Sequence, residues 1–270
     1  MGRSAGREFV FTAEDFERIR KLIHEHAGIA LSPAKQDMVY SRLTRRLRLC
    51  GETSFASYLT RVERDRGEWE AFVNSLTTNL TSFFREAHHF DLLAEQMRAI
   101  GPGRKINIWC CAASTGEEPY SLAITACETF RTLTPPVTIL ASDVNTEVLE
   151  VARRGFYEDE RVARMSPSRL QQYFIREKGG VRVKPELQRL VNFQAINLLA
   201  PHWSVRGPLD VIFCRNVMIY FDKPTQYAIL KRFAPLLAGD GALYAGHSES
   251  FQHAADLFRL IGRTVYKPVT

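Results

Sequence analysis

The chain lacks a long apolar run and has few cysteines. No apolar stretch approaches the roughly 18 residues that a membrane-spanning helix needs, and the opening Met-Gly-Arg-Ser-Ala-Gly-Arg-Glu lacks the apolar core of a secretion signal. The 5 cysteines include no Cys-x-x-Cys pair, and Cys110, Cys111 and Cys214 fall in predicted buried strands. We therefore expect reduced core thiols in a cytoplasmic protein.

A metal-binding pattern is also lacking. Histidines occur in two close pairs, His24/His26 and His88/His89. Residues that are adjacent or two apart on a helix do not share a face. We therefore predict no metal.

The overall composition is that of a soluble globular protein, with 45% hydrophobic and 24% charged residues. A length of 270 residues allows one large domain or two modest ones. The net charge of +6 favours an acidic partner, which leaves nucleic acid, an anionic membrane or an acidic protein open.

Residues 1–78 are predicted to form an all-helical domain. Thr12 and Asp15 resemble a capping box, and Gly28 is suited to end the first helix. A second helix is expected from Ser32-Pro33 to about Leu49. Thr53 is expected to cap a third, and the spacing of Trp69, Phe72, Val73 and Leu76 predicts a fourth.

The second predicted helix carries a cationic stripe. At 100° per residue its members lie within about 100° of one another, away from the apolar face. They are Lys35, Arg42, Arg45 and Arg46, opposite Val39, Leu43 and Leu47. A solvated face is the common explanation of such a run. Because the stripe holds no acid, we favour a docking surface for an acidic partner.

Residues 79–86 are predicted to be a packed linker that lines a site, because they combine aromatic and polar residues without Gly or Pro. From residue 87 onward strands alternate with helices, which predicts an open, mainly parallel sheet. The expected strands are 106–111, 137–142, 191–196, 209–214 and 242–246, with a closing strand near 264–267. The expected helices are 86–97, 117–133, 145–154, 223–237 and 254–258. Gly179-Gly180 predicts a hairpin within a small antiparallel excursion at about 172–190.

The stretch Ile106–Glu118 is typical of the first strand, loop and helix of a Rossmann-like nucleotide site. It has no G-x-G-x-x-G, only Gly116, and Glu117 and Glu118 stand where a pyrophosphate would lie. Two carboxylates repel phosphate and attract a cation. S-adenosylmethionine, with its ammonium and sulfonium groups, fits such a loop, although an ordinary βα unit remains an equal alternative.

Polar residues follow the other predicted strands. Asp143 is placed to accept ribose hydroxyls, Asn197 and Leu198 are suited to an adenine ring, and Arg215-Asn216 ends the fourth strand. Each has a plainer explanation: Asp143 as a helix cap, Asn197 as a turn residue, Arg215 as a salt-bridge partner and Tyr220 as core. All four together are harder to explain by packing.

Several long motifs resemble one family, the chemotaxis protein methyltransferases, which methylate receptor glutamates. They are Asn-Leu-Thr-Ser-Phe-Phe-Arg-Glu at 79–86, Ala-Ala-Ser-Thr-Gly-Glu-Glu-Pro-Tyr-Ser at 112–121, Ser-Asp-Val-Asn at 142–145, Phe-Cys-Arg-Asn-Val-Met-Ile-Tyr-Phe at 213–221 and Ala-Gly-His-Ser-Glu at 245–249. The resemblance implies a Rossmann-like S-adenosylmethionine-binding domain at 87–270 with a β-subdomain, behind a helical receptor-docking domain. It implies a cofactor site of Asn79, Thr81, Arg85, one or both of Glu117 and Glu118, Asp143, Asn197, Leu198, Arg215 and Asn216.

Methyl transfer to a glutamate carboxylate needs no general base, because that group is ionised at neutral pH with an unperturbed pKa of ~4.3. Arg85 and Tyr220 are our candidates for orienting the carboxylate, and S-adenosylhomocysteine is the expected product. An RNA methyltransferase and a catalytically silent receptor-binding module remain alternatives.

Some family members bind a pentapeptide on the receptor tail through the β-subdomain. The link here between Arg176 and Val181 is only Glu-Lys-Gly-Gly, so we expect no tail binding, although a strand edge alone can pair with a peptide.

Overall fold

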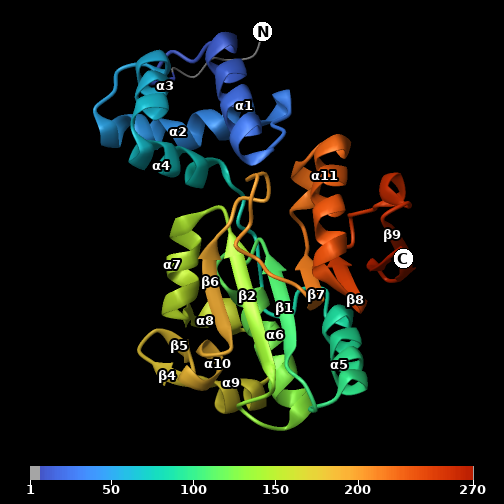
Figure 1. The fold of residues 1–270 in the computed structure, drawn as a ribbon. Coiled ribbons are helices and arrows are strands. Elements are labelled where there is room, and N and C mark those ends of the chain that lie inside the picture. Colours follow the sequence, from blue (N-terminus) through green and yellow to red (C-terminus); the bar gives the residue numbers. More distant parts are fainter. Residues whose placement is uncertain (1–6, 270) are drawn as a thin grey trace. The chain divides into compact units, whose positions relative to one another are not determined.

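The structure is a computed structural model that describes residues 7–269. Its contacts divide the chain into two units (Figure 1). One comprises the residues up to Thr78 together with Tyr220–Asp222. The other comprises Asn79–Ile219 and the chain from Lys223 onward.

The first unit is helical, as predicted. Its helices are α1 (Ala13–Ala27), α2 (Gln36–Cys50), α3 (Phe55–Arg64) and α4 (Arg66–Leu76), with a 3-10 turn η1 (Pro33–Lys35) before α2. Thr12 and Asp15 form the expected capping box, and Gly28 ends α1 at φ 68°. Ser54 caps α3 rather than Thr53, since its hydroxyl accepts a hydrogen bond from Ser57 N.

A buried carboxylate ties α2 to α4. Glu68 is 6% exposed and accepts hydrogen bonds from Arg46 at 3.0 and 2.6 Å, from the Tyr58 hydroxyl at 2.8 Å and from the Cys50 thiol at 3.2 Å. Burial opposes ionisation, but these donors hold the pKa of Glu68 below its usual value. A buried carboxylate is tolerated when paired in this way, so Arg46 serves the interior of the helical unit.

The second unit is built on a seven-stranded sheet, in the order β6-β2-β1-β7-β8-β10-β9. The bounds are β1 Ile106–Cys111, β2 Val137–Asp143, β6 Val191–Ala195, β7 Leu209–Cys214, β8 Leu237–Ala245, β9 Phe258–Gly262 and β10 Val265–Pro268. β1, β2, β6, β7 and β8 pair in parallel and β10 pairs antiparallel, which confirms the predicted sheet.

The helix predicted near Ala254–Phe258 is wrong. A 3-10 turn η4 (Gln252–Ala254) occupies its start, and Phe258 begins the strand β9. The segment between is too short to form a helix of its own, and Phe258 is buried at the sheet. The predicted helix start at Glu86 is also wrong, because that residue has φ 57° and α5 runs from His88 to Ile100.

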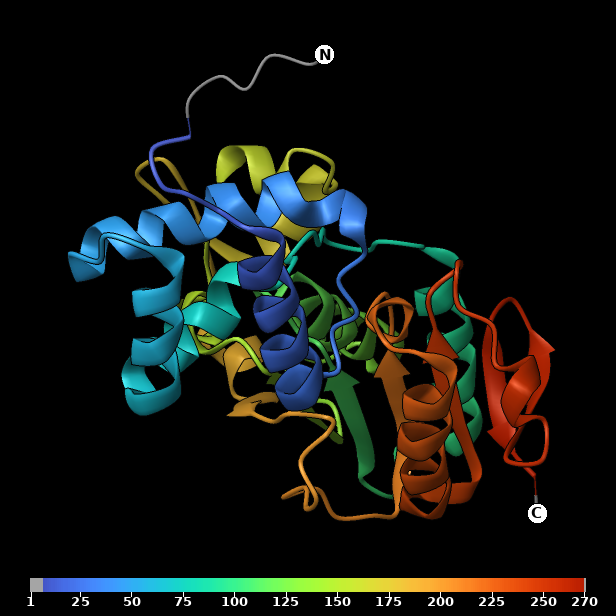
Figure 2. The ribbon, with the colours of Figure 1, turned by 90° about the horizontal axis from the view of Figure 1, so that it is seen from above.

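Helices cover both faces of the sheet (Figure 2). α6 (Glu117–Phe130) packs against α5 on one face, and α11 (Lys223–Phe233) lies on the other, followed by a 3-10 turn η3 (Ala234–Leu236). The two helices lie on opposite faces because both crossovers are right-handed, while the chain moves from β1 to β2 in one direction along the sheet and from β7 to β8 in the other. α7 (Thr146–Arg154) follows β2 and packs on β2 and β6.

The predicted antiparallel excursion is present, and it is larger than expected. Its hairpin consists of β4 (Phe174–Glu177) and β5 (Gly180–Val183), as the Gly-Gly pair predicted. A third strand, β3 (Phe156–Glu158), precedes the expected range and pairs with β5. The short helices α8 (Asp159–Val162), α9 (Pro167–Tyr173) and α10 (Pro185–Gln188) complete this subdomain.

The register of the sheet brings the polar strand ends together. At the carboxyl end of β1, Cys111 pairs with Ser142 of β2 and Cys214 of β7. Cys214 in turn pairs with Ala245 of β8. The loops after β1, β2, β7 and β8 therefore leave the sheet at one edge. Within residues 7–269, no helix is long and apolar enough to cross a membrane.

Candidate functional site

The loop after β1 is a tight turn with strained backbone. Ala112 and Ser114 have φ of 57° and 49°, in the left-handed region that non-glycine residues rarely adopt. Gly116 follows at φ 97°, where an added Cβ would lie 2.7 Å from the Tyr157 hydroxyl. Strained backbone conformations of this kind are common at functional sites. The sequence pattern does not predict the strain.

Asp143 faces this loop from the end of β2. One carboxylate oxygen accepts a hydrogen bond from Ser114 N and the other from Asn145 N, both at 2.9 Å. Burial raises the pKa of Asp143, against these bonds. The helix-cap alternative is wrong for this residue, because Asn145 caps α7. Since a carboxylate accepts about four hydrogen bonds, Asp143 keeps acceptor capacity for a ligand's hydroxyl groups.

Glu117 and Glu118, adjacent in sequence, have different surroundings. Glu117 is fully buried and pairs with Arg161 of α8 at 2.6 Å, and it accepts a bond from the Thr115 hydroxyl. Glu118 lies 3.0 Å from Arg215 Nη1 and accepts a bond from the Cys110 thiol. Glu117 is thus engaged with the β-subdomain, and Glu118 faces the end of β7.

Arg215 is a buried cation with unused donors. Its side chain is fully buried, lies 3.5 Å from Glu86 and donates from Nη2 to the carbonyl of Arg85 at 2.5 Å. Its Nη1 atom is paired with Glu118, and among the described residues its Nε atom has no hydrogen-bond acceptor. Burial raises the pKa of Glu118, and Arg215 opposes that shift. A ligand that carries a carboxylate and an ammonium group would complement both side chains.

Asn216 continues the chain at φ 58° and donates from Nδ2 to Glu86 at 3.4 Å. Its backbone N–H donates to Glu249, a buried carboxylate after β8. Glu86 and Glu249 are the residues that we did not single out from the sequence. Both lie within the motifs quoted above. An acidic residue at the end of a motif is the sequence feature that could have identified them.

The linker residues lie beside the same loop. The Ser114 hydroxyl donates to the carbonyl of Asn79 at 3.2 Å, and Arg85 donates from Nη1 to the carbonyl of Leu80 at 3.0 Å. Thr81 is half-buried. The linker therefore packs on the loop after β1, as predicted from its composition.

Asn197 and Leu198 follow β6. Asn197 Oδ1 accepts a bond from Leu199 N at 2.9 Å, which is the turn role considered above. Leu198 is 8% exposed. Because β6 pairs with β2 in parallel, these residues leave the sheet next to Asp143, whose carbonyl accepts a bond from Ile196 N.

Tyr220 belongs by its contacts to the helical unit. It ends the 3-10 turn η2 (Met218–Tyr220), and its carbonyl accepts a bond from Ala30 N at 2.9 Å. The Lys35 ammonium lies 5.4 Å from its ring centre. Joint action of Tyr220 and Arg85 on one carboxylate stays a prediction.

The cationic stripe is less uniform than the helical projection predicts. Arg42 donates to the carbonyls of Ser75 and Thr77 at the end of α4, and Arg46 is paired with Glu68. Arg45 is exposed and makes no ion pair with any residue in 7–269. Two of the four cations therefore stabilise the helical unit, which leaves the exposed Arg45 and, beside the Tyr220 ring, Lys35 as candidates to contact a partner.

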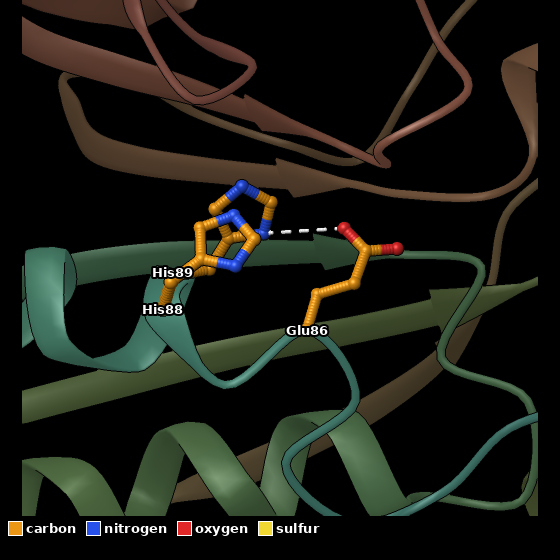
Figure 3. A group of neighbouring side chains, drawn as sticks. All are labelled: Glu86, His88 and His89. Atoms are coloured by element: carbon orange, nitrogen blue, oxygen red, sulfur yellow. Dashed lines mark ion pairs between the residues drawn. The ribbon is translucent and has the colours of Figure 1, made fainter.

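Glu86, His88 and His89 lie close together, and all three are residue types that can bind a metal ion (Figure 3). Their ligand atoms lie within 4.8 Å of one another and the two imidazole rings are 4.2 Å apart, so our argument that adjacent histidines diverge is wrong here. A cation would lie close to the Arg215 guanidinium, 3.5 Å from Glu86. Burial lowers the pKa of His89 to about 4, and its Nε2 donates to the carbonyl of Arg263. The absence of metal stays our prediction.

The family profiles that match this chain define its class, an S-adenosylmethionine-dependent methyltransferase. The profile "CheR methyltransferase, SAM binding domain" matches residues 79–267, and "CheR methyltransferase, all-alpha domain" matches residues 14–77. A TehB-like SAM-dependent methyltransferase from Corynebacterium glutamicum is similar in structure, with a TM-score of 0.39 and 12% identity over 68% of this chain and 96% of its own.

Relatives of high identity agree with the profiles. Chemotaxis protein methyltransferase 2 of Pseudomonas aeruginosa strain PAO1 is 51% identical over 97% of this chain and 95% of its own. The chemotaxis protein methyltransferase of Escherichia coli K12 is 53% identical over 93% of this chain and 89% of its own. The chain belongs to the CheR methyltransferase family, and its activity is S-adenosylmethionine-dependent methylation in chemotaxis.

Proposed function

We propose that the protein transfers the methyl group of S-adenosylmethionine to glutamate side chains of chemotaxis receptors. The products are glutamate methyl esters, which serve sensory adaptation, and S-adenosylhomocysteine. The observation that carries the proposal is a buried site of acids and one arginine in a chain of the chemotaxis methyltransferase family.

The cofactor's amino-acid part is assigned to Glu118 and Arg215. Its ammonium group would lie against Glu118, and its carboxylate would accept from Arg215, whose Nε atom has no hydrogen-bond acceptor among the described residues. Glu118 is the better candidate of the two adjacent acids, because its partner Arg215 belongs to the proposed site, whereas Glu117 is fully buried and paired with Arg161 of the β-subdomain.

The adenosine part is assigned to the neighbouring strand ends. Asp143 would accept the ribose hydroxyls, and Asn197 with Leu198 would contact the adenine. The linker residues Asn79 and Thr81 and the strand-end Asn216 complete the set, because the linker packs on the loop after β1.

The transfer itself requires placement rather than proton removal. The glutamate carboxylate attacks the methyl carbon in line, the sulfonium carbon–sulfur bond breaks, and no proton moves. The protein contributes orientation and the removal of water from the nucleophile. Arg85 and Tyr220 would orient the carboxylate, and incomplete neutralisation by Arg85 would leave it reactive.

The receptor is proposed to bind the helical unit through α2, in its acidic cytoplasmic helical region. Arg45 and Lys35 are the stripe cations that, among the described residues, are neither paired with an acid nor bonded to the backbone at the end of α4. Attraction of an acidic helix to exposed cations raises the rate of encounter. Insertion into a membrane is not part of the proposal.

A direct comparison of substrates tests the proposal. The purified protein is incubated with labelled S-adenosylmethionine and either a receptor cytoplasmic fragment or RNA. Label in the receptor fragment supports it. Label in RNA would replace it with the RNA methyltransferase, and cofactor binding without any transfer would favour the silent binding module.

A further inference from the structure

The turn after β8, residues 246–249, lies against two segments of the site. Its carboxylate, Glu249, is 4% exposed and accepts four backbone hydrogen bonds. Oε2 accepts from Gly246 N at 2.5 Å and Asn216 N at 2.9 Å. Oε1 accepts from Val217 N at 3.0 Å and Met218 N at 2.8 Å.

Three of these donors belong to the loop after β7, which carries Arg215 and Asn216. That loop turns through a left-handed Asn216, a conformation that costs a non-glycine residue about 1–3 kcal/mol unless its surroundings hold it. Glu249 stabilises this conformation, because its carboxylate accepts hydrogen bonds from consecutive backbone N–H groups. Those groups would cost more free energy if they were buried and unpaired.

The same turn also contacts the linker. His247 donates its backbone N–H to Glu86 at 3.1 Å, and its Nδ1 lies 2.9 Å from the same carboxylate. Gly246 allows the close approach, since an added Cβ would lie 2.4 Å from Asn216 Nδ2. The turn therefore joins the ends of β7 and β8 to residue 86 of the linker.

We infer that Glu249 is a positioning residue for the cofactor site, which acts by fixing the backbone of residues 216–218 and with it the side chains of Arg215 and Asn216. It does not touch the cofactor itself. The inference depends on S-adenosylmethionine binding and on the proposed roles of Arg215 and Asn216, and it is independent of the methyl acceptor.

Glu249→Gln tests the inference with almost no change in size. Whichever oxygen becomes the amide NH2, two backbone N–H groups then face a donor. We expect S-adenosylmethionine to bind about tenfold more weakly or worse. The measurement is titration calorimetry, at a temperature where circular dichroism shows a folded protein.

Asp210→Asn is the matched control. Asp210 is a 2% exposed carboxylate near the other end of β7; it accepts from Asn107 N at 2.8 Å and pairs with Arg104. This variant should lose stability but keep the cofactor affinity of the wild type. A general loss of packing would instead weaken binding in both variants, and that result would overturn the inference.

Gly246→Ala provides a second test should Glu249→Gln fail to fold. It keeps the carboxylate and displaces Asn216 by contact with the new methyl group. Loss of affinity is again expected. A folded Glu249→Gln, or failing that a folded Gly246→Ala, that binds within twofold of the wild type contradicts the inference. A wild-type protein that binds the cofactor but leaves receptors unmethylated would refute the proposed substrate and leave the inference standing.

Discussion

At the scale of single residues, Asp143 has the most specific of the proposed roles. Asp143→Ala should weaken S-adenosylmethionine binding by about 1.5–3 kcal/mol, the usual contribution of hydrogen bonds to a charged group. Calorimetry on the folded variant measures this change. Since the carboxylate also accepts from Ser114 N and Asn145 N, some stability will be lost as well. Unchanged affinity in the folded variant would remove Asp143 from the site.

Glu118 predicts a pH dependence of cofactor binding. Burial raises its pKa, so the free protein holds this carboxyl protonated to a higher pH than usual. A bound ammonium group favours the ionised form, so binding should tighten as pH rises through the raised pKa and should release protons at pH values where the free carboxyl is still protonated. Calorimetry in buffers of different ionisation enthalpy measures the proton release.

Glu118→Gln should abolish that release and weaken binding. Glu117→Gln should instead destabilise the fold, because it leaves Arg161 beside a neutral partner at the β-subdomain. If Glu117→Gln removed the proton release and Glu118→Gln did not, the assignment of the two acids would be reversed.

At the scale of elements, we expect the cations of the α2 stripe to have different roles. Arg45→Glu should slow receptor methylation severalfold and leave cofactor affinity unchanged, because Arg45 is exposed and makes no ion pair with the other described residues. Raised salt should slow the wild-type protein in the same way, since surface attraction is screened over ~8 Å at physiological ionic strength. Steady-state methylation of a receptor fragment measures both.

Arg64→Glu, an exposed reversal on α3 outside the stripe, is the control for Arg45. Arg46→Glu is unsuitable as a docking probe, because it leaves buried Glu68 uncompensated at a cost of about 3–5 kcal/mol. Equal rates for Arg45→Glu and wild type at physiological salt would make the stripe a solvated face.

The β4–β5 hairpin predicts that the chain does not bind a receptor-tail pentapeptide. Only Lys178 and Gly179 separate the two strands, which leaves little backbone to surround a peptide. Titration with an acidic-aromatic pentapeptide should show no saturable binding. A dissociation constant in the low micromolar range would show that the free edge of β4 binds the tail by strand pairing.

The sequence predicted the elements whose signals are local. The capping box of α1, the Gly-Gly hairpin and the apolar runs of β1, β2 and β7 all appear where their patterns placed them. β9 was missed because Leu260 and Ile261 are exposed at the sheet edge, so its residues lack the alternation of a half-buried strand.

The placement of the candidate site residues at strand ends was predictable from the sequence, and their contacts with one another were not. Position after a parallel strand selects Asp143, Arg215 and Asn216, because ligands bind at that edge of the sheet. The bonds of Glu249 and the pairing of Glu117 with Arg161 join residues far apart in the chain. The spacing of residues in a single sequence does not predict contacts of this kind.

At the scale of the whole molecule, the proposed function requires both units of the chain, one to bind the cofactor and the other to bind the receptor. The sheet unit holds the features of a cofactor site, and the helical unit offers an exposed cation on α2. Neither unit alone is expected to methylate a receptor, since one lacks the docking surface and the other lacks the strand ends.

The most direct test of the central claim is the chemical nature of the methylated product. A receptor cytoplasmic fragment is incubated with the protein and methyl-labelled S-adenosylmethionine, then treated with mild base. We predict labelled methanol, because glutamate methyl esters hydrolyse in base, and no label in a fragment whose methylated glutamates are replaced by alanine. Base-stable label, or label that persists after those replacements, would contradict methyl ester formation on receptor glutamates.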